Sequence, residues 1–194
     1  FAALDFGNIF HKALEKYAGN VKKALMQAAY DNNLQDYDLS EAETLLTNYL
    51  QSSLYPGLNI KQLHETGFSL PVLAKYGINA QCYGFIDNII YNSDGSLSII
   101  DYKTGHVPDA LPKGYKYQLA LYKLAAEEMF NLPVKSAELH FLRGCVNFEL
   151  PSGFNPEEIA AELQSIFAKT DEREFTCSTA YCHSCPYAYF CKKI

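Results

Sequence analysis

The pattern that most constrains the fold lies in the middle of the chain, where two runs of β-forming residues flank a tight turn. Residues 80–91 and 96–103 are rich in such residues, and Ser93-Asp94-Gly95 between them is typical of a β-hairpin turn. A third run of β-forming residues precedes them at 65–74. The sequence therefore predicts an antiparallel meander of three strands.

Helical patterns surround this meander. Apolar residues recur at helical spacing from Leu4 to about Tyr30 as one stripe, and Ser40 with Glu43 matches a capping box before a second helix. We predict the remaining elements in this order: a helix over 41–52, a helix over 114–130, two strands within 135–150 that part near Arg143-Gly144, and a last helix from Asn155-Pro156.

This order of elements indicates the α/β class, with a central mixed sheet flanked by helices. A length of 194 residues suits one domain. We assign residues 1–175 to that domain and residues 176–194 to a Cys-rich tail that packs on it.

Two acids and one lysine lie on the strands of the predicted hairpin. Asp87 is in the middle of the second strand, and Asp101 ends the third. Because pairing around a turn at 93–95 brings residue 87 close to residue 101, the two carboxylates converge if they share a face. Asp101 and Lys103 do share one, since strand side chains alternate with a period of two.

Two carboxylates in a partly buried site repel each other, and each raises the pKa of the other. A divalent cation removes that repulsion, and Mg²⁺ prefers carboxylate oxygens together with substrate phosphate. Lys103 beside such an ion is placed to orient a water molecule or to stabilise charge on a phosphorane. An exposed Asp–Lys strand end with a separately satisfied Asp87 explains the same residues, so the spacing leaves both interpretations open.

Four further polar residues are candidates for the same site. Gln118 and Tyr122 are four residues apart and present an amide and a phenol on one helix face. His11 falls beside the apolar stripe of the first helix, and Glu65 opens the first strand. Taken singly, each also fits an ordinary role, as the polar edge of an amphipathic helix, a tolerated histidine or a solvated acid.

Taken together and in order, these residues resemble the motifs of the RecB-like branch of the PD-(D/E)XK nucleases. The matching segments are GNIFHKALE around His11, GFIDNII around Asp87, IIDYKTG from Asp101 to Lys103, and Gln118 with Tyr122. The resemblance runs over nearly the whole chain and extends to RecB-, AddA- and AddB-type helicase–nucleases and to CRISPR-associated exonucleases. Ile86 precedes the first Asp where the family name implies Pro, a loss that is frequent in this branch.

The resemblance implies a restriction-endonuclease-like core and a metal-dependent DNA nuclease, which we expect to be an exonuclease. It implies that Mg²⁺ or Mn²⁺ is bound by four groups: His11, Asp87, Asp101 and the backbone carbonyl of Tyr102.

The same resemblance implies roles for the other candidates. Lys103 would act on the attacking water, and Gln118 and Tyr122 would contact DNA or order the site. Glu65 matches an acid that this branch often carries on the preceding strand.

Four of the six cysteines lie near the C-terminus, at Cys177, Cys182, Cys185 and Cys191. Without an export signal, this density and the C-x-x-C spacing favour metal ligation over disulfides, but spacing does not choose between zinc and an iron–sulfur cluster. In the family that the chain resembles, such a tail supplies three ligands of a [4Fe–4S] cluster. We expect the fourth ligand to be a cysteine before Phe1 or Cys177, and free thiols remain the alternative.

The formal net charge of -6 argues against a free-standing nucleic-acid-binding domain. We therefore expect DNA to be delivered by a helicase, in cis or as a separate partner protein, along a local basic strip of Lys113, Lys116, Lys123 and Arg143. The chain opens on Phe1 within a helical pattern, which is typical of a domain cut from a longer polypeptide.

The sequence contains neither a membrane-spanning run nor a signal peptide, so we expect a cytoplasmic protein with no membrane partner. The resemblance implies a role in DNA recombination and repair. One alternative is an inactive nuclease-fold module that binds DNA or serves as a scaffold, which the joint presence of Asp87, Asp101 and Lys103 disfavours. A second is a zinc-ribbon interaction domain in which the tail is the functional part.

Overall fold

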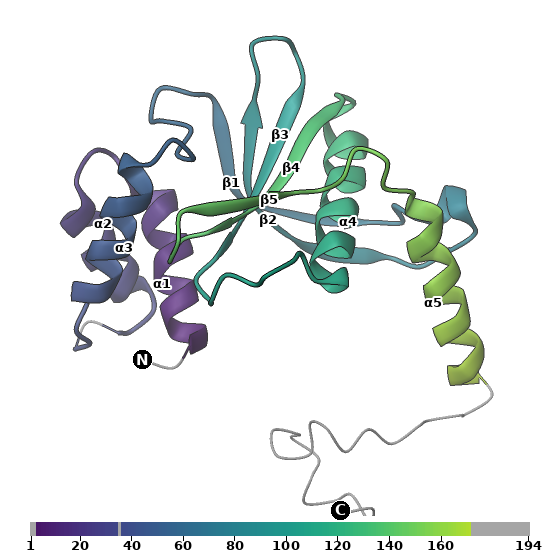
Figure 1. Ribbon diagram of the computed structural model, residues 1–194, viewed down its shortest axis with the longest axis horizontal. Coiled ribbons are helices and arrows are strands. Elements are labelled where there is room, and N and C mark those ends of the chain that lie inside the picture. Colours follow the sequence, from purple (N-terminus) through teal and green to yellow (C-terminus); the bar gives the residue numbers. More distant parts are fainter. Residues whose placement is uncertain (1–2, 35, 172–194) are drawn as a thin grey trace, which may run out of the picture.

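A computed structural model describes residues 3–34 and 36–171 of the chain. In this part, five strands form one sheet in the order β1-β2-β3-β4-β5 (Figure 1). The strands are β1 (Gln62–Leu70), β2 (Cys82–Tyr91), β3 (Leu97–Lys103), β4 (Val134–Phe141) and β5 (Val146–Glu149). All neighbours are antiparallel except β3 and β4, which run parallel, so the sheet is mixed as predicted.

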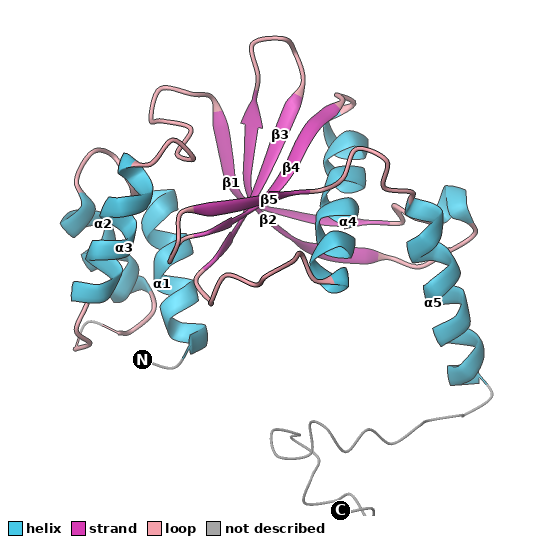
Figure 2. Ribbon diagram, in the orientation of Figure 1, coloured by secondary structure: helices cyan, strands magenta, loops and turns pink. Residues whose placement is uncertain are grey.

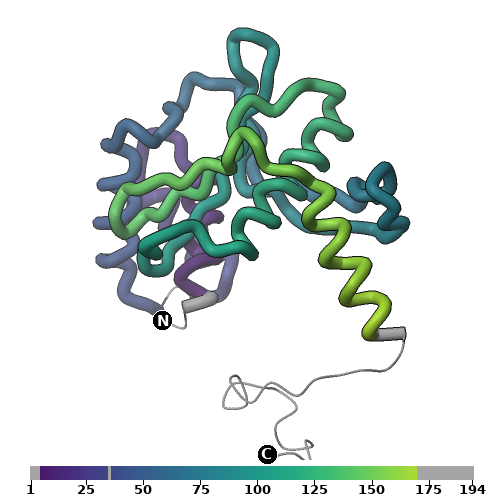
Figure 3. Tube along the Cα trace, turned by 45° about the vertical axis from the view of Figure 1, so that its right-hand side comes forward, coloured from purple at the N-terminus to yellow at the C-terminus, as the bar shows by residue number. Residues whose placement is uncertain are grey.

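The helices cover the sheet from opposite sides (Figure 2). They are α1 (Ala3–Lys16), α2 (Val21–Asp31), α3 (Ser40–Gln51), α4 (Lys113–Phe130) and α5 (Pro156–Asp171), with a short 3₁₀ helix η1 (Ala74–Tyr76). Helices α1 to α3 form one apolar cluster with the sheet, and α4 forms the other. Helix α4 supplies the crossover that the parallel pair β3–β4 requires. Helix α5 contacts η1 at the far end of the β1–β2 hairpin (Figure 3).

Strand β3 separates the two clusters by simple alternation. Leu97 and Ile99 belong to the cluster with α4, whereas Ile100 and Tyr102 belong to the cluster with α1 to α3. Side chains of a strand point alternately to its two faces. The strand is therefore buried on both sides, and its two faces pack against different helices.

At one point of the β1–β2 ladder, the side chains of the two strands switch the face of the sheet to which they point. Pairs form on both sides of Glu65 and Asp87, but these two residues form none themselves. Ile89 before this break and Ile86 after it both pack in the cluster with α4, although side chains three positions apart on a regular strand point to opposite faces. Glu65 has φ of 48°, a left-handed conformation that non-glycine residues rarely adopt. We call this break at Glu65 and Asp87 the face switch.

The prediction of one helical stripe from Leu4 to about Tyr30 is wrong. Helix α1 ends at Lys16 and α2 begins at Val21. Gly19 between them has φ of 93°, and the side chain of Asn20 caps α2 by accepting a hydrogen bond from the Lys23 N–H. A Gly-Asn pair is a helix stop and start signal, and the apolar periodicity runs across it.

The capping box at Ser40 and Glu43 is also absent. Leu39 is the N-cap and its side chain makes no capping hydrogen bond, while Ser40 is the first residue of α3. The Ser40 N–H instead donates to Asp38 Oδ1 at 2.9 Å. The helix itself lies within one residue of the predicted range.

Other predicted elements are confirmed. The hairpin between β2 and β3 turns at Asn92–Gly95, where the Gly95 N–H donates to the Asn92 carbonyl. The helix predicted over 114–130, the two strands within 135–150 and the helix from Pro156 are all present. In the described part of the chain, no helix is both long and apolar enough to cross a membrane.

Candidate metal and catalytic site

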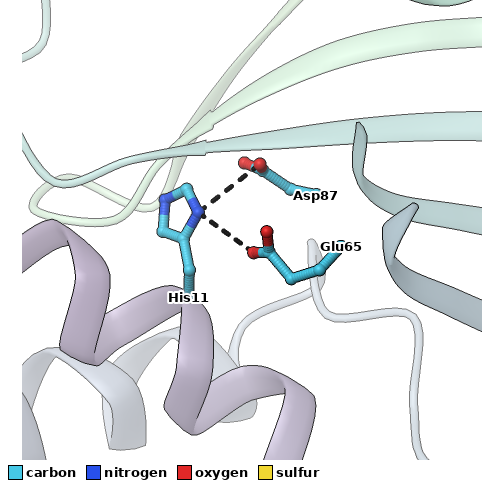
Figure 4. Close-up of side chains that lie close together, drawn as sticks. All are labelled: His11, Glu65 and Asp87. Carbon is cyan, nitrogen blue, oxygen red and sulfur yellow. Dashed lines mark ion pairs between the residues drawn. The ribbon is translucent and has the colours of Figure 1, made fainter. Parts of the chain in front are cut away.

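Three side chains from three elements meet beside the sheet. His11 comes from α1, Glu65 from β1 and Asp87 from β2 (Figure 4). His11 Nδ1 lies 3.4 Å from Asp87 Oδ1 and 3.5 Å from Glu65 Oε1. One ligand atom from each residue lies within 4.8 Å of the other two. We call these three residues the acid–histidine cluster.

Both ring nitrogens of His11 face oxygen atoms. Nε2 lies 3.1 Å from the carbonyl oxygen of Tyr102, while Nδ1 faces the two acids. Only the doubly protonated imidazolium can donate in both directions. Burial alone lowers the pKa of His11, but hydrogen bonds and charge from Asp87 and Glu65 outweigh burial and raise it to about 10. A proton on His11 therefore compensates the acids when no metal does.

Asp87 is anchored to the neighbouring strand by a backbone hydrogen bond. The last ladder pair of β2 and β3 on this side is Asn88 with Ile100. One step further, the Tyr102 N–H donates to Asp87 Oδ2 at 2.7 Å. The same register places Asp101 opposite Asp87, as the hairpin predicts.

Asp101 and Lys103 lie on the α4 side of β3. Asp101 is only 2% exposed, and Lys103 Nζ lies 2.6 Å from its Oδ2. This contact is an ion pair whose geometry is not that of a hydrogen bond. Oδ2 of Asp101 is buried and accepts no hydrogen bond from the described residues. Burial and the charge of Asp87 together raise the pKa of Asp101 to about 6, although Lys103 lowers it.

Helix α4 continues this polar line. Lys103 Nζ donates to Gln118 Oε1 at 3.1 Å, and Gln118 Nε2 donates to Tyr122 Oη at 3.0 Å. Burial and the charge of Asp101 raise the pKa of Tyr122 to about 12, so its hydroxyl stays protonated at neutral pH. Because Gln118 fixes the ammonium group from the side opposite Asp101, Lys103 has one defined position.

The structure groups the predicted site residues in two sets. Glu65, expected as an accessory acid, joins His11 and Asp87 within ligand distance of one another, and Asp101 does not belong to that group. Asp101 instead pairs with Lys103. The carbonyl of Tyr102 lies on the far side of the His11 ring from the acids. The predicted residues thus converge as two adjoining groups joined by the backbone of Tyr102.

A buried polar network behind Tyr102 has no counterpart in the predictions. The Tyr102 hydroxyl accepts from Asn88 Nδ2 at 3.0 Å, and its ring packs edge-on against Tyr49 at 5.6 Å between centroids. The Tyr49 hydroxyl lies 2.9 Å from His140 Nδ1. Asn88 and His140 are polar residues within apolar strand sequences, which is the one signal that marks them. They hold the strand whose backbone contacts both His11 and Asp87.

The predicted basic strip is largely neutralised within the chain. Lys113, Lys123 and Arg143 each form an ion pair with a glutamate, at 2.5 to 2.7 Å. Lys116 is half-buried. Of the four, no ion pair of Lys116 is found among the described residues, so the role of the strip in DNA contact stays a prediction.

The cysteine tail lies outside the described residues. This applies to Cys177, Cys182, Cys185 and Cys191, and to the predicted boundary at residues 175 and 176. Their assignment stays a prediction.

Comparison with known proteins decides the family. The family model described as "PD-(D/E)XK nuclease superfamily" matches residues 1–192 of the chain. The chain belongs to the PD-(D/E)XK nuclease superfamily. The pattern in the superfamily name is found here as Asp87 and as Asp101-Tyr102-Lys103, with Ile86 at the position of its proline. The pattern that names the superfamily thus coincides with the two adjoining groups of this nuclease domain.

One curated relative in the comparison belongs to an ATP-dependent helicase/nuclease of Moorella thermoacetica, of which it is one subunit. It is 35% identical over 99 residues, which cover 51% of this chain and 6% of that protein. The aligned region is thus a small part of a much longer relative. Among solved structures, the crystal structure of SSO0001 matches with a TM-score of 0.46 and 18% identity, and the match covers 98% of this chain and 84% of that one. That likeness is too weak to guide interpretation.

The acid–histidine cluster of this nuclease domain fits a divalent cation. It offers carboxylate oxygens, which Mg²⁺ and Mn²⁺ prefer, and an imidazole, which suits transition metals. Asp101 Oδ2 is already compensated by the Lys103 ammonium group at 2.6 Å, so the case for a cation rests on the acid–histidine cluster. The unusual protonation of His11 is the expected state of a metal site without its metal, because bound metals displace protons from their ligands.

Proposed function

We propose that this nuclease domain hydrolyses phosphodiester bonds of DNA with Mg²⁺ or Mn²⁺ as cofactor, and that it acts as an exonuclease. The observation that carries this proposal is the meeting of the acid–histidine cluster with the Asp101–Lys103 pair across the backbone of Tyr102. A cation-binding group and a positioned ammonium group are the two elements that phosphate hydrolysis requires.

We assign the cation to His11, Glu65 and Asp87, with Asp101 opposite Asp87 on the neighbouring strand. The carbonyl of Tyr102 faces the other nitrogen of the His11 ring and lies outside this ligand set. When bound, such an ion polarises the phosphate and lowers the pKa of a water molecule. The protein contributes the geometry. Asp87 is fixed by the Tyr102 N–H, and His11 gives up a proton so that a nitrogen lone pair becomes free for ligation.

Lys103, on the α4 side of β3, would stabilise negative charge on the reacting phosphate. Its Nζ is held between Asp101 Oδ2 and Gln118 Oε1, and it is largely shielded from solvent. A positive charge at low exposure stabilises the extra negative charge of a phosphorane more strongly than it would in water. Gln118, supported by the Tyr122 hydroxyl, keeps the ammonium group from moving away.

The helicase context is part of the same proposal. The matched relative is part of a helicase/nuclease, which supports a helicase, in cis or as a partner protein. A role in DNA recombination and repair and a cytoplasmic location are proposed from the family resemblance alone. The internal pairing of Lys113, Lys123 and Arg143 adds a physical reason, because paired cations contribute less to the attraction of phosphate and leave more of it to another component that brings DNA.

The direct test is a nuclease assay on end-labelled linear DNA and on circular DNA, with Mg²⁺, Mn²⁺ or EDTA. We expect metal-dependent degradation of linear DNA only, and its loss in Asp87→Ala and in Lys103→Ala. Lys135→Ala is the matched control, because Lys135 is exposed and pairs with Asp94 at the β2–β3 turn. Intact degradation in both site variants would refute the nuclease assignment, and equal digestion of circular DNA would refute the exonuclease.

For the tail, we propose that Cys182, Cys185 and Cys191, with Cys177 or a cysteine before Phe1, bind a [4Fe–4S] cluster. This rests on the family resemblance, because their spacing indicates metal ligation but does not choose between a cluster and zinc. Metal analysis of anaerobically purified protein separates the alternatives, since iron with sulfide supports the cluster and stoichiometric zinc supports a zinc site.

A further inference from the structure

Two aromatic rings stand in solvent on β2 next to the acid–histidine cluster. Tyr83 is 85% exposed and Phe85 is 62% exposed. They are two residues apart on one strand and so point to the same face. Their cross-strand partners on β1 are Ser69 and Gly67, which are small. We call Tyr83 and Phe85 the aromatic pair.

The face switch puts the aromatic pair outside. Beyond Asp87, the even-numbered Ile86 faces α4, so Tyr83 and Phe85 face away from that core. A Cβ atom at Gly67 would lie 3.1 Å from Cε1 of Phe85. Glycine therefore lets the Phe85 ring lie flat over β1, with its other side open to solvent.

The aromatic pair is continuous with the proposed active site. Phe85 lines an open cavity of about 370 Å³ together with His11 and Glu65. The other lining residues are polar and come from α1 and α2, among them Asn8 and Asn32. A nucleic-acid strand that runs along β2 away from the acid–histidine cluster would therefore meet Phe85 first and Tyr83 next.

We propose that Tyr83 and Phe85 form a stacking platform for the unpaired bases of a single-stranded nucleic acid that leads to the active site. This inference rests on the proposed nuclease function and adds the surface that selects the form of the substrate. Aromatic side chains bind single strands by stacking on successive bases. The neighbours of the pair across the ladder are a glycine and a serine, whose small side chains leave both rings accessible to bases.

The spacing of the rings favours an unpaired strand. Side chains two residues apart on a strand are roughly 6.6 to 6.8 Å apart, about twice the 3.4 Å between bases along one strand of a duplex. Two neighbouring bases of a stacked duplex therefore cannot each cover one ring. Bases of an extended single strand can, because their faces are free.

Binding assays test the platform. Fluorescence anisotropy gives the Kd of a labelled 12-nucleotide oligothymidylate and of a blunt duplex of the same length, with Ca²⁺ in place of Mg²⁺ to limit cleavage. We expect Tyr83→Ala and Phe85→Ala each to weaken binding of the single strand by roughly 5- to 150-fold, with little change for the duplex. Tyr30→Ala is the matched control, since Tyr30 is an exposed tyrosine on α2, 67% accessible, that does not line the cavity.

Two further variants distinguish stacking from a simple apolar contact. Phe85→Trp should keep the affinity for the single strand, whereas Phe85→Leu should lose it, because leucine has no aromatic face. Far-ultraviolet circular dichroism checks that each variant is folded. An oligonucleotide with abasic sites should bind the wild-type protein as weakly as the intact one binds the double alanine variant.

The outcomes separate this inference from the proposed function. If the wild-type protein cleaves the oligonucleotide with Mg²⁺ but the double alanine variant binds it as tightly as wild type, the platform is refuted and the nuclease assignment stands. Wild-type affinity in Phe85→Leu, or an equal loss of duplex binding, also refutes the platform. If the wild-type protein neither binds nor cleaves the oligonucleotide, both proposals fail.

Discussion

The backbone N–H of Tyr102 donates a 2.7 Å hydrogen bond to Oδ2 of Asp87, one step beyond the last ladder pair of β2 and β3. A carboxylate thus takes the place of a strand carbonyl as acceptor. The acid that β2 contributes is thereby positioned by β3, the strand that carries Asp101 and Lys103.

Two substitutions of Asp87 should separate its contribution to the free energy of unfolding from its contribution to cleavage. Asp87→Asn keeps an oxygen for the Tyr102 N–H, whereas Asp87→Ala leaves a buried donor unsatisfied, at a cost of about 1–3 kcal/mol. In EDTA, urea unfolding should show the alanine variant to be less stable than the asparagine variant by that order. Both should lose metal-dependent cleavage. Equal stability of the two variants would mean that the hydrogen bond contributes little to folding.

Asp101 should destabilise the metal-free protein at neutral pH. Its pKa is raised from 3.8 to about 6 in the folded state, so its favourable contribution exists below about pH 4 and is lost as the pH rises through 6. Asp101→Asn should therefore raise the free energy of unfolding at pH 8, on the order of 1–3 kcal/mol. The difference from wild type should vanish near pH 4.

The matched control for this titration has the opposite sign. Asp94 is an acid whose pKa is lowered by hydrogen bonds from Ser96 and Lys135. Asp94→Asn should therefore lower stability at pH 8, and this loss should fade in acid. Urea unfolding in EDTA at pH 8, 6, 4 and 3 measures both variants. The loss in Asp94→Asn should persist down to about pH 4 and fade only below it, because the pKa of Asp94 is lowered from 3.8. A destabilised Asp101→Asn at pH 8 would contradict the prediction.

Glu65 combines a ligand role with a strained backbone, at φ of 48°. Glu65→Gly and Glu65→Ala both remove the carboxylate and should weaken Mn²⁺ binding alike in titration calorimetry. Glycine adopts a left-handed conformation without strain, so the glycine variant should be more stable than the alanine variant by about 1 kcal/mol. A more stable alanine variant would show that no strain is present at this position.

The hydroxyl of Tyr122 should affect the rate more than the fold. Tyr122→Phe keeps the edge-on packing against Phe68, at 5.9 Å between centroids, and loses the acceptor for Gln118. One neutral hydrogen bond corresponds to a fall of roughly 2- to 10-fold in the single-turnover cleavage rate. Tyr117→Phe, elsewhere on the same helix where the hydroxyl bonds Glu162, should leave the rate unchanged. A similar rate change in both variants would argue against the Gln118 link.

The sequence predicted those features that depend on local periodicity. The hairpin turn, the order of the strands and the shared face of Asp101 and Lys103 all follow from spacing along the chain. The convergence of Asp87 with Asp101 follows from the hairpin register. Gly19-Asn20 is a sequence signal for the end of one helix and the start of the next. The prediction missed it because the apolar periodicity continues across this pair.

Features that depend on a local departure from periodicity could not be predicted. Alternation places Glu65 on a regular strand, whereas its left-handed backbone turns it toward His11 and Asp87. For this reason, only the family resemblance indicated Glu65 as an accessory acid. In the same way, Lys113 and Arg143 looked free in the sequence because their acidic partners, Glu162 and Glu41, are distant in the chain. The pairing of Lys123 with Glu127, four residues on, could have been predicted from helical spacing.

The face switch divides the β1–β2 hairpin into two stretches that contact different parts of the protein. In the described residues, β2 pairs with β3 only next to the Asp94 turn, at Asn88–Tyr91, whereas beyond Asp87 it pairs with β1 and packs its inner side in the cluster with α4. Substitutions in the outer stretch, on its solvent side, therefore change what the strand presents without disturbing the inner stretch. A protein built this way can alter the nucleic acid it prefers while it keeps the chemistry it performs.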